Sequence, residues 1–329
     1  MLNPNLNLNE KLFDNPEKVA TREGFGQALV RLGKVNPYVV VLTADLKEST
    51  KCEEFAKAFP NRFFEVGVAE QNLAAIAAGL GVSGKVPFIA SYSVFSPGKN
   101  WETIRTTIVY NKANVKIAGH HAGIITGPDG ATHQATEDLA LTQSLPGLSV
   151  FIPCDAIEAR KMTVESAEIE GPVYLRYSRE KTPLITTEET PSPKGKVTTF
   201  WTSERPQVTI FATGHMVYYA LLAAKTLGQD GVQSLVINVS SLKPLDEEGI
   251  IEAVKKTGCG VTVEDHQIIG GLGSTISQVL AKNTPAPLEF IGLRDVFGQS
   301  GEASELIKEY QMDEKSIAEA AKKVIKRKG

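Results

Sequence analysis

Short apolar runs rich in β-branched residues alternate with helix-length segments along most of the chain, and this pattern limits the possible fold more than any other feature. Between about residues 37 and 177 the runs are YVVVLT, FFEVGV, VPFIA, VKIAG, LSVFIP and PVYLRY. They are nearly continuous instead of alternating, as expected for parallel strands that helices cover on both faces. The sequence therefore predicts an α/β fold with a doubly wound, mostly parallel sheet.

A second series of such runs, VTIFAT, VQSLVINV, GVTVED and LEFIGL, follows a polar and proline-rich stretch. The stretch TPLITTEETPSPKGK has no periodic apolar face, which is typical of a connection between domains. A chain of 329 residues also suggests two domains, at roughly 150 residues each. We expect a first domain at residues 1–185, a linker at 186–204 and a smaller α/β domain at 205–329.

Charge and cysteine content exclude several functional classes. The formal net charge of -3 gives no basic field, so nucleic acid and membrane surfaces are not expected partners. Cys52, Cys154 and Cys259 are widely spaced, which argues against a disulfide framework and favours a reducing compartment. The first residues, MLNPNLNLNE, lack the basic and apolar regions of a signal peptide. We expect a soluble, cytoplasmic protein.

A carboxylate lies where an apolar strand gives way to a helix of small residues, in FFEVGVAEQNLAAIAAGLG. Glu70 begins this helix, and its Ala, Ile, Leu and Gly neighbours predict a dry environment in which a carboxyl group can share a proton. A helix-start glutamate favoured by the helix dipole is the simpler interpretation. Glu70 is therefore a candidate proton-transferring group whose assignment depends on its neighbours.

Two aromatic residues follow the next strand, in VPFIASYSVFSPGKNW. Tyr92 and Phe95 are about one helical turn apart, where loops at the carboxyl ends of parallel strands build ligand pockets. They could stack on a flat heterocycle, or they could simply fill the core.

The segment KIAGHHAGIITGPDGATHQATEDLA has the highest density of candidate residues, with His120, His121, Asp129 and His133 in a glycine-rich loop. Glycines permit tight or left-handed backbone, and imidazoles can bind oxyanions and hydroxyls or shuttle protons. A metal site and a solvated loop with incidental histidines are the alternatives. No cysteine accompanies the histidines and their spacing is not H-x-x-x-H, so we expect no metal ligands here.

Three further polar residues lie next to the ends of expected elements: Arg22, Ser49 and Arg179. Arg179 follows a strand and could clamp a phosphate bidentately, although an isolated arginine is more often a surface ion-pair residue. GGLGS at residues 270–274 lacks the third glycine of a dinucleotide loop, so we expect a tight strand–helix turn there.

These motifs together resemble the transketolase family. TADL at residues 43–46, EVGVAEQNLAAIAAGL at 65–80 and GPDGATHQATEDLALTQSLPGLSVFIPCD at 127–155 resemble its pyrimidine-binding domain. INVSSLKPLD, TVEDH and RDVFGQSG resemble its C-terminal domain, and the resemblance is collinear over nearly the whole chain. It implies a thiamine diphosphate-dependent enzyme that moves a two-carbon ketol unit from a ketose phosphate to an aldose phosphate.

The resemblance also implies cofactor contacts. Glu70 matches the carboxylate that hydrogen-bonds the aminopyrimidine ring of thiamine diphosphate and thereby promotes deprotonation of the thiazolium carbon. Tyr92 and Phe95 match the aromatic pyrimidine pocket, whose third aromatic position is occupied here by Gly98. Asp45 matches an acidic residue near the cofactor.

Substrate contacts follow in the same way. His121, Asp129 and His133 match groups that contact the sugar hydroxyls and assist proton transfer, and His133 is expected to be catalytic. The phosphate end of the substrate channel is matched by four residues: Arg22, Ser49, His121 and Arg179. A phosphorylated sugar is the expected substrate.

One family element is absent from the sequence. The family holds Mg²⁺ and the diphosphate with a GDG loop and a downstream asparagine, and GPDGATHQ does not replace this pattern. The resemblance therefore implies the C-terminal-half subunit of a split transketolase. We expect an N-terminal-half partner subunit that binds Mg²⁺ and shares the thiamine diphosphate, in a heterotetramer of two large and two small chains.

Three alternatives remain open. Deoxyxylulose-phosphate synthase has similar A-E-Q and D-G-x-T-H-Q patterns but resembles the chain less around His121. The beta chain of 2-oxo-acid decarboxylases lacks the loop from Asp129 to His133. A non-catalytic partner subunit of this fold is the third alternative.

Overall fold

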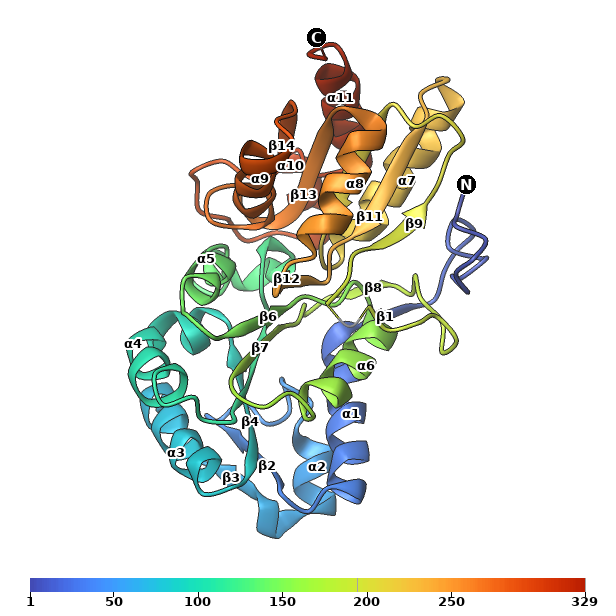
Figure 1. Ribbon diagram of the computed structural model, residues 1–329. Coiled ribbons are helices and arrows are strands. Elements are labelled where there is room, and N and C mark those ends of the chain that lie inside the picture. The colour runs from blue at the N-terminus through green and yellow to red at the C-terminus, as the bar shows by residue number, and fades with distance from the viewer. Residues whose placement is uncertain (194, 329) are drawn as a thin grey trace.

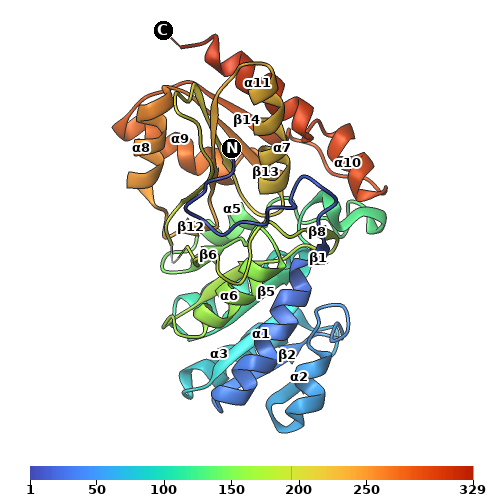
Figure 2. The same ribbon diagram turned by 90° about the vertical axis from the view of Figure 1, so that its right-hand side faces the viewer.

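The computed structural model describes residues 1–193 and 195–328, which form two large β-sheets, each lying between layers of helices (Figure 1). The first sheet lies in the blue-to-green half of the chain, apart from one short edge strand, and the second lies in the yellow-to-red half (Figures 1 and 2). Both are mostly parallel, so the predicted α/β fold class is confirmed. Over the described ranges, no helix is long and apolar enough to cross a membrane.

Seven strands form the first sheet within the described residues, in the order β12-β6-β7-β5-β4-β2-β3. Neighbours from β6 to β3 are parallel, whereas β12 is antiparallel to β6. The strands are β2 (Val39–Thr43), β3 (Phe63–Glu65), β4 (Val86–Tyr92), β5 (Lys116–His120), β6 (Ser149–Phe151), β7 (Val173–Arg176) and β12 (Ser241–Lys243).

Helices cover both faces of this sheet. Phe25, Phe55 and Met162 belong to the core on the face that α1, α2 and α6 cover, and Leu73, Ile104 and Leu139 to the core on the opposite face. This two-sided burial explains why the strand sequences are continuous apolar runs. The helical elements are α1 (Thr21–Val35), α2 (Glu53–Ala58), η1 (Pro60–Arg62), α3 (Glu70–Val82), η2 (Val94–Lys99), α4 (Trp101–Thr103), η3 (Ile104–Val109), η4 (Ile124–Asp129), α5 (Asp138–Gln143) and α6 (Ala156–Ser166).

Among the described residues, the second sheet has five strands, in the order β14-β13-β10-β11-β9. Its strands are β9 (Thr198–Trp201), β10 (Val208–Ala212), β11 (Ser234–Asn238), β13 (Gly260–Gln267) and β14 (Leu288–Leu293). The helices around it are α7 (Met216–Gln229), α8 (Glu247–Thr257), α9 (Leu272–Asn283), α10 (Ala303–Glu309) and α11 (Glu314–Ile325). Residues of α8 and α9 join the same core cluster as α3, so the hydrophobic core continues between the two halves.

Three segments cross the expected domain division. β9 lies inside the expected linker, because TTFW can pair antiparallel with β11 at the sheet edge. Residues 1–13 fall within the expected first domain, yet Leu8 and Leu12 are buried in the core of the second. β12 comes from the second half of the chain and extends the first sheet. A short antiparallel pair, β1 (Lys18–Ala20) and β8 (Lys181–Pro183), brings the start of α1 beside the end of the first sheet.

The carboxyl ends of central strands in both sheets meet at the junction between the halves. Arg176, the last residue of β7, donates to the backbone carbonyl of Asp265 in β13 at 2.8 Å. Loops that follow these strand ends therefore lie where both halves can contact them.

Candidate active site

All of the candidate residues except Arg22 come from segments that follow parallel strands of the first sheet. Asp45 and Ser49 follow β2, and Glu70 begins α3 after β3. Tyr92 ends β4, with Phe95 in η2 just after it, and His121 follows β5. Arg22 lies in the first turn of α1, and Arg179 follows β7. Parallel strands bring these segments to the same edge of the first sheet, as the sequence pattern predicted.

Glu70 is buried, and its side chain is only 3% exposed. The Lys99 ammonium, whose side chain is 52% exposed, contacts its Oε2 at 3.0 Å. Asn100 Nδ2 donates to the Glu70 backbone carbonyl at 2.9 Å and to Ser96 Oγ at 3.2 Å. The dry surroundings expected from the sequence are present, but the lysine partner was not anticipated. In the sequence, this partner could have been found from the charged side chain of Lys99, which follows Gly98 at the end of η2.

Tyr92 and Phe95 stack with ring centroids 6.0 Å apart and planes 15° from parallel. Both rings are partly exposed, which makes them available to a flat ligand. His133 is in edge contact with them, 5.6 Å from Phe95 and 6.1 Å from Tyr92 between centroids. The aromatic pair and the catalytic candidate of the glycine-rich loop are therefore adjacent.

His121 connects the aromatic pair to Arg22. Its ring stacks on Tyr92 at 3.9 Å, and Arg22 Nη1 donates to its Nε2 at 3.3 Å. Arg22 Nη1 also donates to the backbone carbonyl of Ser49 at 3.1 Å, so the hydroxyl of Ser49 is not part of this contact. Burial, followed by the charges of Arg22 and Arg179, lowers the pKa of His121 to about 3.

A histidine with this pKa is neutral at pH 7. Because guanidinium groups only donate, the lone pair of His121 is on Nε2 and its proton on Nδ1. The backbone of His121 is left-handed, at φ +53, and its carbonyl accepts from Thr126 Oγ1 at 2.6 Å. His121 is therefore a fixed hydrogen-bonding group and a poor proton donor.

Arg179 and Asp129 form an ion pair, with Nη1 3.0 Å from Oδ1. Both side chains are about 30% exposed or less, at 28% and 30%. Arg179 also donates to the carbonyl of Thr126 at 2.7 Å, which ties it to η4. This arginine is thus oriented by the glycine-rich loop while part of its surface faces solvent.

Asp45 does not contact the aromatic pair, the histidines or the arginines of the candidate site. It has a left-handed backbone at φ +62, is exposed, and its N–H donates to Glu65 Oε1 at 2.7 Å. Glu65 also accepts from Thr43 Oγ1 at 2.6 Å and from the Gly67 N–H at 3.1 Å. Glu65 therefore stabilises the turns after β2 and β3. In the sequence, the only indication of this role is a charged residue within the apolar run FFEVGV.

The GGLGS segment forms the tight strand–helix turn that was predicted. Gly270 has φ +79, and α9 begins at Leu272. The first N–H groups of α9, those of Leu272 and Gly273, donate to the Glu264 carboxylate at 2.6 and 2.8 Å. A carboxylate of the chain itself therefore occupies the position that an anion takes at a helix N-terminus.

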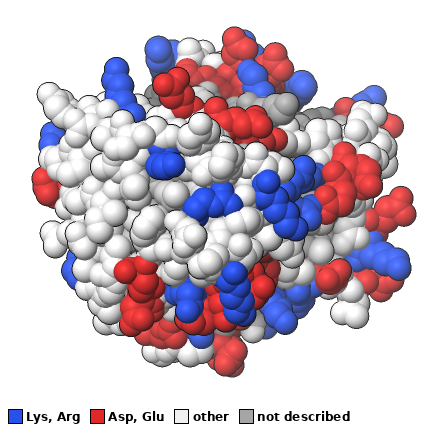
Figure 3. All heavy atoms as spheres, turned by 90° about the horizontal axis from the view of Figure 1, so that it is seen from below, with Lys and Arg blue, Asp and Glu red and all other residues white. Residues whose placement is uncertain are grey.

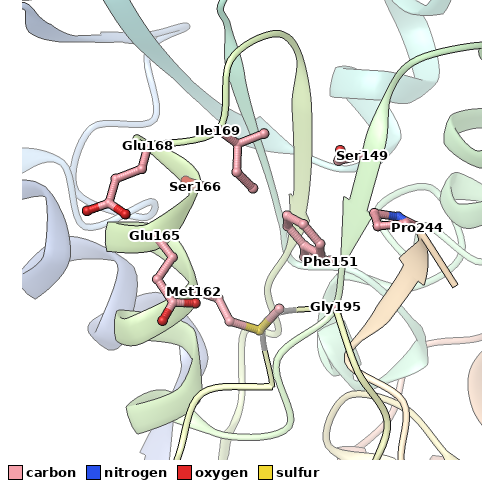
Figure 4. Close-up of a pocket in the computed structure, with 9 residues that line it drawn as sticks. All are labelled: Ser149, Phe151, Met162, Glu165, Ser166, Glu168, Ile169, Gly195 and Pro244. Atoms are coloured by element: carbon pink, nitrogen blue, oxygen red, sulfur yellow. The ribbon is translucent and has the colours of Figure 1, made fainter. Parts of the chain in front are cut away.

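A cavity of about 460 Å³ lies elsewhere, between β6, α6 and the segment that contains Pro244 (Figure 4). Phe151, Met162 and Ile169 supply its apolar wall, while Glu165 and Glu168 lie along α6 and the turn after it. No candidate residue lines this cavity. Over residues 1–193 and 195–328, no group of three or more His, Cys, Asp or Glu side chains is arranged to hold a metal ion.

The sequence matches two family models in succession. The transketolase pyrimidine-binding domain matches residues 17–184, and the transketolase C-terminal domain matches residues 199–317. The chain belongs to the transketolase family. This confirms the resemblance drawn from the motifs around Glu70 and His133.

Similar proteins of this family include separate half-length chains. A putative transketolase C-terminal section from Methanocaldococcus jannaschii is 44% identical over 302 residues, which cover 90% of the chain and 93% of that protein. A 6-deoxy-6-sulfo-D-fructose transketolase subunit from Clostridium sp. is 36% identical over 93% of the chain and 95% of its own length.

A solved structure shares the same architecture. It is described as a split gene transketolase, inactive beta4 tetramer, and superposes with a TM-score of 0.88 at 45% identity. The match covers 94% of the chain and 100% of that protein. The chain is therefore a split-transketolase subunit of the C-terminal type.

Proposed function

We propose that the chain is the half of a two-chain transketolase that activates the pyrimidine ring of thiamine diphosphate and binds the sugar substrates. The observation that carries the proposal is the buried Glu70 carboxylate, which begins α3 close to the segment that carries Tyr92, Phe95, Lys99 and Asn100. A carboxylate held out of water can exchange a proton with a ring nitrogen.

The residues present fit this cofactor. Partly exposed, stacked Tyr92 and Phe95 offer apolar faces to a heterocycle, and Gly98 leaves room where the family has a third aromatic side chain. Thiamine diphosphate, when bound, supplies the nucleophilic thiazolium carbon that carries the two-carbon unit. Glu70 would hold a proton at its carboxylate oxygen, and Lys99, whose side chain is half exposed, would yield that oxygen to the ring.

The loop side of the site supplies sugar contacts. His133 is the candidate to move a proton at the substrate hydroxyls, while neutral His121 accepts or donates hydrogen bonds without changing charge. Arg22 and Arg179 provide the positive charge that a phosphorylated or sulfonated sugar needs. Asp129 orients Arg179 and can accept from a sugar hydroxyl. Ser49 borders this side through its backbone carbonyl, which accepts from Arg22, and Asp45, on the same segment after β2, is the acidic residue proposed to lie near the cofactor.

A partner chain would supply Mg²⁺ and the diphosphate contacts. The surface of α3 and its surroundings suits this partner, because Val68, Val82 and Tyr110 are 73%, 66% and 85% exposed. Figure 3 shows the molecule from below, with few charges on its left side, which is the side of α3 and α4 in Figure 1. We propose an N-terminal-half partner there, in an assembly of two large and two small chains, and a cytoplasmic location.

The deciding experiment pairs the chain with a candidate large subunit that contains GDG and the downstream asparagine. Ketol transfer from xylulose 5-phosphate to an aldose phosphate is expected with Mg²⁺ and thiamine diphosphate. The absence of transfer with every such partner, despite bound cofactor, would contradict the proposal. Activity with pyruvate as the donor would instead favour a deoxyxylulose-phosphate synthase.

Cofactor binding by the chain alone gives an independent test. Calorimetry with thiamine diphosphate and Mg²⁺ should detect no tight binding, because the diphosphate and metal contacts belong to the partner. Tight, Mg²⁺-dependent binding to the isolated chain would overturn the division of the site between two chains.

A further inference from the structure

The second half of the chain contacts the glycine-rich loop through Asp265, near the end of β13. The Asp265 carboxylate is buried, and its Oδ1 accepts from the Ile124 N–H at 2.9 Å. The Ile125 N–H lies 3.5 Å from Oδ2. Ile124 and Ile125 begin η4, so the carboxylate caps the segment between His121 and His133.

The glycines of this loop make room for the second half of the chain. A Cβ on Gly123, where φ is +81, would lie 1.9 Å from Asp265 Oδ2. At Gly130, with φ +74, it would lie 2.5 Å from Ser300 Oγ. These positions are therefore restricted both by backbone conformation and by contacts from the other half.

Gln134 fastens the far end of the loop. Its Nε2 donates to the carbonyl of Ile124 at 3.1 Å, to that of Gly127 at 3.3 Å and to that of Gln299 at 2.9 Å. Gln299 belongs to the segment between β14 and α10. The loop is thus bonded to the second half near both of its ends.

Asp265 is itself fixed to the first sheet. Arg176 donates to the Asp265 carbonyl at 2.8 Å and forms a buried ion pair with Asp138, with Nε 2.8 Å from Oδ2. Because Asp265 is anchored by its backbone to β7 and by its carboxylate to η4, it cannot follow the loop into another conformation without breaking a buried contact.

We propose that Asp265 is a positioning residue that holds residues 121–134 in the conformation in which His121 and His133 face Tyr92 and Phe95. This inference rests on the proposed function, in which the loop binds the sugar. The C-terminal half of the chain then sets substrate affinity without contacting the substrate, and a change at Asp265 would alter KM for the sugars.

Glu264 provides a matched control on the same strand. Like Asp265 it is a buried carboxylate that accepts from two consecutive backbone N–H groups, but those belong to α9. Glu264→Gln alters a carboxyl group of equal burial whose hydrogen bonds lie within the second half, whereas Asp265→Asn weakens the contact with the loop.

Hydrogen exchange on the full chain tests the contact without any activity assay. Asp265→Asn should speed amide exchange in peptides covering residues 121–134 by about tenfold or more, because their local opening becomes easier. Glu264→Gln should speed exchange in α9 and leave the loop peptides near wild type. Equal exchange of the loop in wild type and Asp265→Asn, or an equal increase in both variants, would overturn the proposal.

Kinetics in the assembled enzyme separate positioning from stability. Asp265→Asn should raise KM for the ketose phosphate by about tenfold while the thiamine diphosphate Kd stays within about twofold, and Glu264→Gln should leave KM unchanged. Gly123→Ala should reproduce the KM effect and should not add to it in the double variant. Additive effects, or a change in cofactor affinity equal to that in KM, would contradict the role. If no partner supports ketol transfer, the proposed function fails while the exchange result still decides the contact.

Discussion

The buried carboxylates at the junction of the halves differ from Glu70 in how many hydrogen-bond partners the chain gives them. At the junction of the halves, Asp138 accepts from Tyr174 Oη at 2.6 Å and from Arg176 at 2.8 and 3.1 Å, while Asp265 accepts from the loop. Glu158 accepts from the Cys154 N–H and from Asn238 and Ser240. Glu70 is equally buried, at 2%, yet in the described chain its side chain is bonded to one half-exposed lysine.

Burial alone therefore does not distinguish a functional carboxylate from a structural one here. The junction carboxylates, Asp138, Glu158 and Asp265, have their partners within the chain. Glu158 and Asp265 bond groups of the other half directly, and Asp138 binds Arg176, which donates to the Asp265 carbonyl. Glu70 has only the half-exposed Lys99 as a side-chain partner among the described residues, so its carboxylate keeps hydrogen-bonding capacity for a ligand. The following predictions are ways to break or sharpen this distinction, in order of decreasing effect.

Glu70→Gln should have the largest effect, in the enzyme assembled with its partner. Loss of the carboxylate that we propose exchanges a proton with the cofactor is expected to lower kcat by about 10²- to 10⁴-fold, with a nearly unchanged melting temperature. Steady-state kinetics and calorimetric unfolding measure the two quantities. Glu319→Gln, which alters an exposed carboxylate of α11 in the second half, is the control and should keep full activity. An unchanged rate for Glu70→Gln would mean that another carboxylate activates the cofactor.

Arg176→Met should instead lower stability, because it leaves the buried Asp138 side chain without its ion-pair partner. Removing one partner of a buried ion pair is expected to lower the free energy of unfolding by about 3–5 kcal/mol. Urea denaturation of the isolated chain measures this loss. A loss below about 1 kcal/mol, the size expected of a surface pair, would show that the junction charges are not stabilised as a buried network.

Glu158 should make stability depend on pH. Burial, only partly offset by the hydrogen bond from the Cys154 N–H, raises its pKa from 4.5 to about 7. The folded state then binds more protons than the unfolded state between these values, so stability falls as pH rises through this window and levels off above it. The contribution of this group is about 3 kcal/mol over the window.

Urea denaturation at several pH values measures this slope. Glu158→Gln, which has no proton to exchange, should show a flatter profile between pH 5 and 7 than the wild type. Glu168→Gln, which alters an exposed carboxylate after α6, should keep the wild-type profile. The same slope in wild type and Glu158→Gln would contradict the role of this junction carboxylate.

Thr132→Ala should have the smallest effect, because it removes a solvent-exposed contact of His133. Thr132 Oγ1 lies 2.9 Å from His133 Nδ1 and restricts the orientation of the imidazole. Loss of one exposed hydrogen bond of about 0.5–1.5 kcal/mol should lower kcat/KM by about two- to tenfold without a change in stability. A loss as large as that of Glu70→Gln would place Thr132 in the chemistry itself.

The sequence determined the elements and the order of the motifs. Strands such as VVVLT and KIAGH are buried on both faces, so their continuous apolar residues identify them without any tertiary information. Glu70 could be located because a charge at the start of a small-residue helix is a local feature. The family resemblance then predicted roles for Tyr92, Phe95 and His133, and these roles stay predictions.

Tertiary structure alone decided which polar groups form hydrogen bonds and ion pairs with distant parts of the chain. Asp265 and Ile124 are separated by 141 positions, and no local pattern connects a carboxylate on one strand with two N–H groups of a distant loop. The same holds for Arg176, which follows a strand as Arg179 does but is buried against Asp138. Hydrogen bonds depend on positions in space to within a few tenths of an ångström, whereas strand and helix formation depends mainly on neighbouring residues.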